Sequence, residues 1–241
     1  MDDAPTCPSD LARYPAPHLA VDLVLLTICE DALKVLMMRR GQEPFAGQFV
    51  LPGGFVHPDE MLEDTARRVL AGKARLGAVP VEQLYSFSAP GRDPRGWVVS
   101  VAYFALAPCG ELAGVVGEDE ALELVGIEPR EVHDVALTLD GAPVEPGFDH
   151  HAIITTAVQR LRGKLDWSMV AFGLLPQEFT LFELQRVHEV ILGRSILKPP
   201  FRKKMLERTF ADGRRLVPTG RFARAGRHRP AELYRLAPGT E

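Results

Sequence analysis

The sequence predicts an α/β protein with two domains, an α/β sandwich followed by a winged helix-turn-helix domain. Its 241 residues suffice for two hydrophobic cores. Strand and helix patterns mix up to about residue 165, as in a sheet covered by helices. The charge then changes sign, because residues 1–175 carry 14 Lys and Arg against 25 Asp and Glu, whereas residues 176–241 carry 14 against 7. This asymmetry favours a polyanionic partner for the second half alone.

Three segments are expected along the chain. Residues 1–17 contain four prolines and little periodicity, which is typical of a flexible arm. Residues 18–165 form the predicted first domain, and residues 166–241 form a connector and the second domain. No apolar run reaches the roughly 18 residues of a membrane span, since Asp22 interrupts the strongest candidate, 19–28. The start is acidic, unlike a secretory signal, so we expect a soluble, cytoplasmic protein without a membrane partner.

The cysteines are few and far apart in the sequence. Cys7, Cys29 and Cys109 form no CxxC pair and have no histidine at metal-ligand spacing. We therefore expect three reduced thiols.

The first domain shows a clear order of strands and helices. Apolar residues at 19–28 and 33–38 flank Glu30 and Asp31, which predicts a hairpin. The other predicted elements are a short strand at 47–56 that ends in two glycines, a helix at 59–74, a buried strand at 97–106 and a helix at 149–162. The apolar face of the helix at 59–74 is expected to contain Met61, Leu62, Ala66, Val69, Leu70 and Lys73.

A spaced motif crosses the two glycines and the helix after them. Gly54 is followed after five residues by Glu60, and after seven more by Arg68. This spacing resembles the front of a Nudix box, the signature of enzymes that hydrolyse nucleoside diphosphates linked to another moiety. Residues 83–106 extend the resemblance to the Nudix-related transcriptional regulators and to the ADP-ribose-hydrolysing branch near them. The resemblance implies the Nudix α/β/α sandwich over residues 18–165.

The metal-binding carboxylates of the box are replaced in this sequence. In the family, the arginine precedes three glutamates at helix positions that share one face and hold divalent cations. The corresponding residues here are Val69, Gly72 and Lys73, and Arg75 stands where the box has glycine. No metal, cofactor or catalytic residue is therefore expected. We interpret Glu60 as a charge that suits a helix N-terminus rather than as a base.

The resemblance also implies that the first domain senses a metabolite. Regulators of this kind are known to bind ADP-ribose or a related product of NAD metabolism, and sugar-pathway members bind other ligands, so we expect a phosphorylated effector. Arginines and close backbone amides suit phosphate, and Lys73 places a cation at the lost metal position. The candidate contacts are Arg39, Arg40, Gly53, Gly54, Phe55, Lys73, Arg92 and Arg95. Alternatively, Arg39 and Arg40 could be solvated. Residues 91–96 could equally be a turn held by Asp93 and an arginine.

The second domain opens with a complete helix start. Thr180 and Glu183 have the spacing of a capping box for a helix at 180–192. Phe179 can pack against Leu184 across its first turn. A helical connector is expected before it, at 167–175.

A second, basic helix follows, with two prolines at its start. In this helix, residues 201–210, Phe201 and Met205 can face a core while Arg202 and Lys203 point outward, as a recognition helix in a major groove requires. Strands at 215–220 and 231–236 would flank a basic wing that contacts phosphate. The candidate DNA contacts are Arg194, Lys198, Arg202, Lys203, Lys204, Arg221, Arg224, Arg227, His228 and Arg229.

Residues 179–194, 201–204 and 229–235 resemble the winged-helix half of the same regulators. The chain is therefore expected to be a ligand-responsive DNA-binding regulator, a repressor and, as the family implies, a homodimer on double-stranded operator DNA. One alternative is an active Nudix pyrophosphatase with an accessory nucleic-acid-binding domain, whose carboxylates would come from Glu118, Asp119, Glu120 and Glu123. Another is a Nudix-fold interaction module with an RNA-binding tail.

Overall fold

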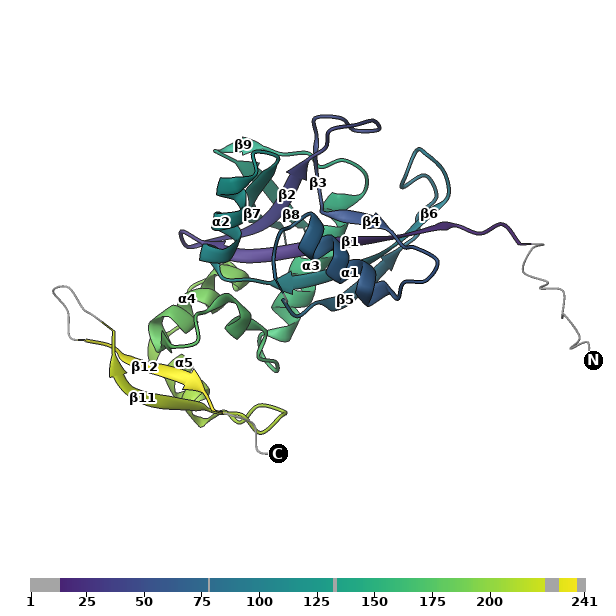
Figure 1. The fold of residues 1–241 in the computed structure, drawn as a ribbon. Coiled ribbons are helices and arrows are strands. Elements are labelled where there is room, and N and C mark those ends of the chain that lie inside the picture. The colour runs from purple at the N-terminus through teal and green to yellow at the C-terminus, as the bar shows by residue number, and fades with distance from the viewer. Residues whose placement is uncertain (1–13, 78, 132–133, 224–229, 238–241) are drawn as a thin grey trace, which may run out of the picture.

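The computed structural model describes residues 14–77, 79–131, 134–223 and 230–237. Within these residues a mixed sheet lies between helices, and a smaller unit of helices and a three-stranded sheet follows (Figure 1). No helix among the described residues is long and apolar enough to cross a membrane. The fold is therefore the predicted α/β sandwich with a winged helix-turn-helix.

The large sheet has the order β5-β6-β1-β2-β7-β8-β9, with β3 paired to β2 and β4 paired to β1. Its strands are β1 (His18–Cys29), β2 (Ala32–Arg39), β3 (Phe49–Val50), β4 (Gly53–Phe55), β5 (Glu82–Phe87), β6 (Val98–Leu106), β7 (Leu122–Glu131), β8 (Asp134–Leu139) and β9 (Ala142–Pro143). Strand β1 is central because it pairs in parallel with β6 and antiparallel with β2. The predicted hairpin is confirmed, and Glu30 and Asp31 close it with positive φ angles of 54° and 60°.

Helices cover both faces of this sheet (Figure 1). Strand residues alternate between the faces, so Val21, Leu23 and Leu25 pack with helices α1 (Leu62–Gly72) and α2 (Cys109–Glu118). Val24 and Leu26 pack on the other face with α3 (His150–Lys164). The double burial explains why β1 reads as a nearly continuous apolar run.

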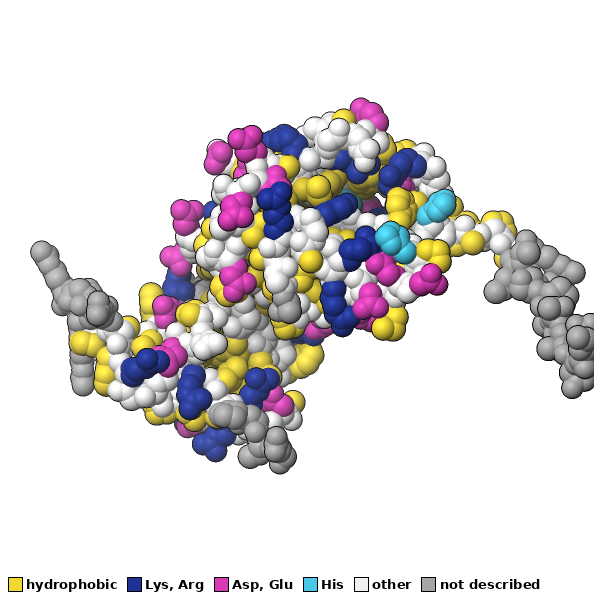
Figure 2. Space-filling model, viewed as in Figure 1, with side chains coloured by type: hydrophobic (Ala, Val, Ile, Leu, Met, Phe, Trp, Pro, Cys, Tyr) yellow, Lys and Arg dark blue, Asp and Glu magenta, His cyan; other side chains and the backbone are white. Residues whose placement is uncertain are grey.

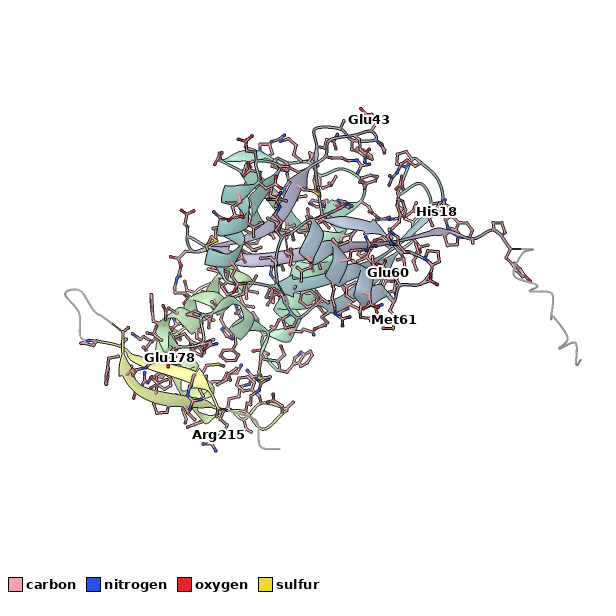
Figure 3. All side chains as sticks on the ribbon, viewed as in Figure 1. His18, Glu43, Glu60, Met61, Glu178 and Arg215 are labelled. Atoms are coloured by element: carbon pink, nitrogen blue, oxygen red, sulfur yellow. A yellow bond between two sulfur atoms is a disulfide. The ribbon has the colours of Figure 1, made fainter. Side chains whose placement is uncertain are left out.

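In the first half of the chain, a predicted strand and a predicted helix differ in detail from the structure. The strand expected at 47–56 is divided into β3 and β4, because β3 pairs with β2 whereas β4 pairs with β1. The helix expected from residue 59 starts at Leu62, so Met61 lies outside it and 66% of its surface is exposed. Figure 3 shows Met61 directed away from the sheet.

The expectation of three reduced thiols is wrong for two of them. A disulfide joins Cys29, the last residue of β1, to Cys109, the first residue of α2, with 5.3 Å between the Cα atoms. The two cysteines are 80 residues apart in the chain. Their spacing in the sequence does not predict this bond. The two cysteines meet because α2 packs beside the end of β1.

The smaller unit begins with a short 3₁₀ helix, η2 (Val170–Leu174), where a longer helical connector was expected. The other elements are β10 (Phe179–Thr180), α4 (Leu181–Leu192), α5 (Lys198–Glu207), β11 (Leu216–Phe222) and β12 (Glu232–Leu236), and the sheet order is β10-β12-β11. The capping box of Thr180 and Glu183 is present at the start of α4. Helix α5 opens with its prolines at the first positions and ends at Glu207, three residues before the predicted end.

The two halves share one hydrophobic core. The apolar side chains beneath α3 continue without interruption into Leu184 and Val187 of α4 and Phe201 of α5. Arg162 at the end of α3 donates a hydrogen bond of 2.9 Å to the carbonyl of Ile191. Gly193 ends α4 in the left-handed conformation, and a Cβ there would lie 2.9 Å from Pro129 of β7, so a larger residue would push the halves apart.

Candidate functional site

A cavity of about 340 Å³ opens at the ends of β1 and β4. Its lining also includes residues before α3 and the end of α1. The lining residues are Ala20, Asp22, Met38, Arg40, Gly41, Gln42, Val50, Leu51, Gly53, Gly54, Phe55, Lys73, Arg92, Asp93, Arg95, Val98, Phe148 and His150. Seven of the eight candidate ligand contacts belong to this lining, and Arg39 does not. The pocket thus brings together segments that are far apart in the sequence.

Arg40 has a free hydrogen-bond donor at this pocket. Its Nε donates to the Pro44 carbonyl at 2.5 Å, and its guanidinium lies 5.1 Å from the centre of the Phe148 ring. One terminal nitrogen is buried with no hydrogen-bond partner. A buried N–H without an acceptor is unfavourable, so an oxygen of a bound ligand would stabilise it. Arg39 instead bonds to the Gly47 carbonyl and stacks on Phe49.

Lys73 brings a second cation to the pocket. Its Nζ donates to the Gly53 carbonyl. Burial lowers the pKa of Lys73, and the nearby Arg40 charge lowers it further. Two cations that repel each other in one cavity favour an anionic ligand. Gly53 is required beside them, because any Cβ there would collide with the Asp22 carboxylate.

The arginines of the 91–96 loop have internal partners. Arg92 is buried and forms a bidentate pair with Asp149, at 2.6 and 2.8 Å, and a longer contact of 3.4 Å to Asp22. Arg95 is paired with Asp93 at 2.6 Å, the turn arrangement that the sequence left open. The Arg95 guanidinium also lies 5.4 Å from the Phe55 ring centre. Arg92 therefore fixes the wall of the pocket, while the partly exposed Arg95 borders it.

Several polar or aromatic members of the pocket are not among the predicted contacts, notably Asp22, Phe148 and His150. Asp22 is buried and accepts a hydrogen bond of 2.6 Å from the Ser100 hydroxyl. His150 accepts the Leu51 amide proton at 2.8 Å through Nδ1, and burial lowers the pKa of its ring. The sequence signal for this part of the pocket is Asp22, an aspartate inside the apolar segment 19–28.

A basic surface covers the winged-helix half. Arg194, Lys198, Arg202, Lys203 and Lys204 are all exposed on α5 and the segment before it. Lys204 pairs with Asp166 at 2.8 Å, and Arg221 pairs with Glu178, which Figure 3 labels on this half. Figure 2 shows Lys and Arg side chains spread over the same half. Arg224, Arg227, His228 and Arg229 lie outside the described residues.

A groove of about 480 Å³ lies between the start of α4, helix α5 and the strands of the wing. Lys198 and Arg202 line it together with the exposed aromatic rings of Phe182 and Phe222. Arg202 also interacts with the hydroxyl of Tyr234 in β12. The basic residues in the first turns of α5 therefore line the same groove as residues of the wing strands.

Both halves match known families. The NUDIX domain model matches residues 16–164, and the model of the NrtR DNA-binding winged helix domain matches residues 171–236. The chain is 35% identical over 226 residues to the ADPR responsive transcriptional repressor NtrR of Acinetobacter baylyi, covering 93% of this chain and 84% of the relative. The chain belongs to the Nudix-related transcriptional regulators. The expected resemblance and fold are thereby confirmed.

Two further relatives match this chain over different lengths. The crystal structure of Shewanella oneidensis NrtR complexed with a 27mer DNA has 35% sequence identity and a TM-score of 0.73, covering 91% of this chain and 93% of that one. An ADP-ribose pyrophosphatase of Methanocaldococcus jannaschii is 39% identical over 108 residues, which cover 43% of this chain and 60% of the enzyme. The likeness to NrtR thus spans both halves of the chain, whereas the likeness to this pyrophosphatase covers less than half of it.

The box positions of this regulator have other structural roles. Val69 is buried against the sheet, and Gly72 is exposed. Glu60 pairs with Arg68 through two hydrogen bonds of 2.5 and 2.8 Å, and the bond to Arg68 is the main reason that the pKa of Glu60 falls to about 2. Figure 3 shows Glu60 beside α1. Glu60 is thus an ion-pair partner and does not line the pocket.

Carboxylates in the part of the chain that the structure describes do not gather as a metal site. No group of three or more His, Cys, Asp or Glu side chains there could hold an ion. In the acidic stretch after α2, Asp119 pairs with Arg75 at 3.0 Å, and no residue of that stretch lines the pocket. Figure 2 shows acidic side chains on the outer surface near α2 and β9.

Proposed function

We propose that this regulator is a repressor whose pocket binds ADP-ribose without metal and without hydrolysing it. The observation that supports this best is that one pocket contains both Lys73, at a former metal-ligand position, and a buried Arg40 nitrogen that has no hydrogen-bond partner. A diphosphate would supply oxygen acceptors for both groups. The Acinetobacter baylyi repressor carries ADPR in its name, which favours this ligand over other phosphorylated metabolites.

The remaining candidate contacts would bind different parts of the ligand. Backbone at Gly53 and Gly54 allows close approach of a phosphate, and the Phe55 ring offers an apolar face to a base or sugar. Arg95 can contact the ligand from the rim, whereas Arg92 acts by holding Asp149 and Asp22 in place. Arg39 lies outside the lining and is the weakest of the proposed contacts.

We further propose that the box residues Val69, Gly72 and Lys73 leave the regulator without pyrophosphatase activity. A buried valine, a glycine and a cation supply no oxygen ligand for Mg²⁺. The internal pairing of Glu60 with Arg68 removes the remaining box carboxylate from the pocket.

On the DNA side, we propose that a homodimer places one α5 helix in the major groove of each operator half-site. Arg202 and Lys203 would reach base edges, Arg194 and Lys198 would contact phosphate, and Lys204 would have to leave Asp166 to do so. The wing would add Arg221 together with Arg224, Arg227, His228 and Arg229. The sensing unit would comprise residues 18–165 and the DNA-binding unit residues 166–241, in the cytoplasm where the operator lies.

One set of measurements tests this proposal. Duplexes selected from a random DNA library by the effector-free protein serve as operators. ADP-ribose in the presence of EDTA should change the operator Kd by about 5–150-fold, the usual range of allosteric coupling. Incubation of ADP-ribose with Mg²⁺ or Mn²⁺ should release no AMP at enzymatic rates.

Two outcomes would contradict the proposal. Release of AMP at about one per second or faster would establish the alternative, an active pyrophosphatase. Unchanged operator binding with ADP-ribose, combined with no calorimetric signal, would exclude this ligand as the effector. Preference for RNA over duplex DNA would instead support the interaction module.

A further inference from the structure

The disulfide between Cys29 and Cys109 lies next to the junction of the two halves. Cys29 ends β1 and directly precedes the turn formed by Glu30 and Asp31. Asp31 pairs with Arg186 of α4 at 3.2 Å, so this turn contacts the DNA-binding half. Helix α2 packs on the opposite face of the sheet from α4, and the β1–β2 turn, which follows Cys29, is the part of this region that reaches α4.

We propose that Cys29 and Cys109 form a reversible thiol–disulfide switch that sets how firmly α4 is held against the sensing half. The proposal rests on the proposed function for its effect on DNA affinity. The predicted tightening of α4 against the sensing half does not depend on the proposed function, because it follows from the disulfide and the β1–β2 turn.

The placement of the two sulfurs suits reversible oxidation. Disulfides in cytoplasmic proteins are typically transient and redox-sensing, because the cytoplasm keeps thiols reduced. Cys109 is the first residue of α2 and is partly exposed, and the positive end of a helix favours the reactive thiolate. Cys29 is buried against it. Cys109 is thus the accessible sulfur and Cys29 the resolving one.

The chemistry requires a peroxide as oxidant and a dithiol as reductant. The Cys109 thiolate attacks one peroxide oxygen and becomes a sulfenic acid while water leaves after proton uptake. The Cys29 thiol then displaces the sulfenic oxygen as a second water and forms the disulfide. A dithiol returns both thiols by exchange through a mixed disulfide and is itself oxidised.

The route from the disulfide to α4 is short. The bond ties the end of β1 to α2, which fixes the turn that presents Asp31 to Arg186. Strand β2 leaves the same turn, and its Leu33 and Val35 share a core with Leu184 and Val187 of α4. Breaking the disulfide would therefore free the hairpin end beneath α4. The oxidised form should hold the DNA-binding half more rigidly and bind operator more tightly, because less ordering accompanies binding.

The test uses the full chain with Cys7→Ser, so that only the two cysteines of the proposed switch remain. One sample is treated with dithiothreitol, another with hydrogen peroxide followed by catalase. Mass spectrometry should find both cysteines protected from alkylation only after peroxide. Amide exchange in residues 181–192 should be at least about threefold slower in the oxidised protein. The Kd for a duplex selected from a random library should fall by about three- to tenfold on oxidation, and reducing the sample should reverse this.

Variants separate the switch from general oxidation. Cys29→Ala with Cys109→Ala should show no response to peroxide, and Asp31→Asn should keep the disulfide but lose most of the effect on α4. Glu30→Gln is the matched control, because Glu30 pairs with Lys34 in the same hairpin.

Equal amide exchange in α4 for both redox states, failure of the disulfide to form, or unchanged or weaker operator binding on oxidation would overturn the proposal. A full effect in Asp31→Asn would overturn the route. If neither redox form binds any selected duplex or ADP-ribose, the proposed function fails, and the exchange measurement still decides the structural switch.

Discussion

Replacing Lys73 by methionine removes one of the two cations from the pocket while keeping the length of the side chain. Lys73 lies at the end of α1 with its ammonium group on the Gly53 carbonyl. If it meets a phosphate oxygen of ADP-ribose, the pair of charges at about 4 Å is worth about 4 kcal/mol at an effective dielectric of about 20. The Lys73 side chain is only partly shielded from solvent, so screening and desolvation reduce the net value to about 1–2 kcal/mol.

Lys73→Met should therefore weaken ADP-ribose binding by about 5- to 30-fold. Isothermal titration in EDTA measures it, with Arg67→Met as the matched control, because Arg67 lies on the same helix, pairs with Asp64 and does not line the pocket. The lowered pKa of Lys73 predicts in addition that ADP-ribose affinity depends on pH. Affinity should fall as the pH rises toward this pKa, because the ammonium group loses its charge, and Lys73→Arg should be free of this decline.

Two results would refute the reasoning. A Kd for Lys73→Met within twofold of the wild-type value would mean that the cation does not contact the diphosphate. An equal loss in Arg67→Met would mean that the measurement reports the general charge of the protein rather than the pocket.

Three further predictions concern the DNA surface and the stability of the fold. Arg202→Ala should cost about 1–3 kcal/mol and relax base preference at one operator position, whereas Lys198→Ala should weaken all sequences alike and lower the salt slope by about one; titrations at several salt concentrations distinguish them. The pKa of buried His150 is lowered in the folded state, so stability should fall as the pH drops below 6.5, where the unfolded chain takes up a proton, and chemical denaturation should show a smaller fall in His150→Gln. Thr180→Ala removes the capping box of α4 and should lower the free energy of unfolding by about 1 kcal/mol, whereas the exposed Thr209→Ala should not.

The positions of the secondary-structure elements could largely be predicted from the sequence. The hairpin around Glu30 and Asp31 and the helix that begins after Thr180 follow from local rules, because turn residues, capping side chains and apolar periodicity act within a few residues. The lost box positions, Val69 to Lys73, were equally visible, since they require only a spacing. Predicted element ends were less accurate, because pairing partners decide where β3 and β4 stop.

The composition of the pocket depended on the tertiary structure. Asp22 and His150 lie 128 positions apart in the chain, yet their side chains approach within 3.7 Å because β1 and the start of α3 meet at one end of the sheet. The same is true of Arg92 and Asp149, which form an ion pair at 2.6 Å in the wall of the pocket.

The sequence by itself determined what kind of protein this is. Local periodicity, the altered box and the opposite charges of the two halves are properties of short segments, and they predict a sensing domain with Val69, Gly72 and Lys73 at the box positions and a basic winged helix. Only the tertiary structure decided which cations remain free, which cysteines meet, and how α4 lies against the sensing half. These are contacts between residues far apart in the chain, and no local rule encodes them because the packing of whole elements brings the partners together.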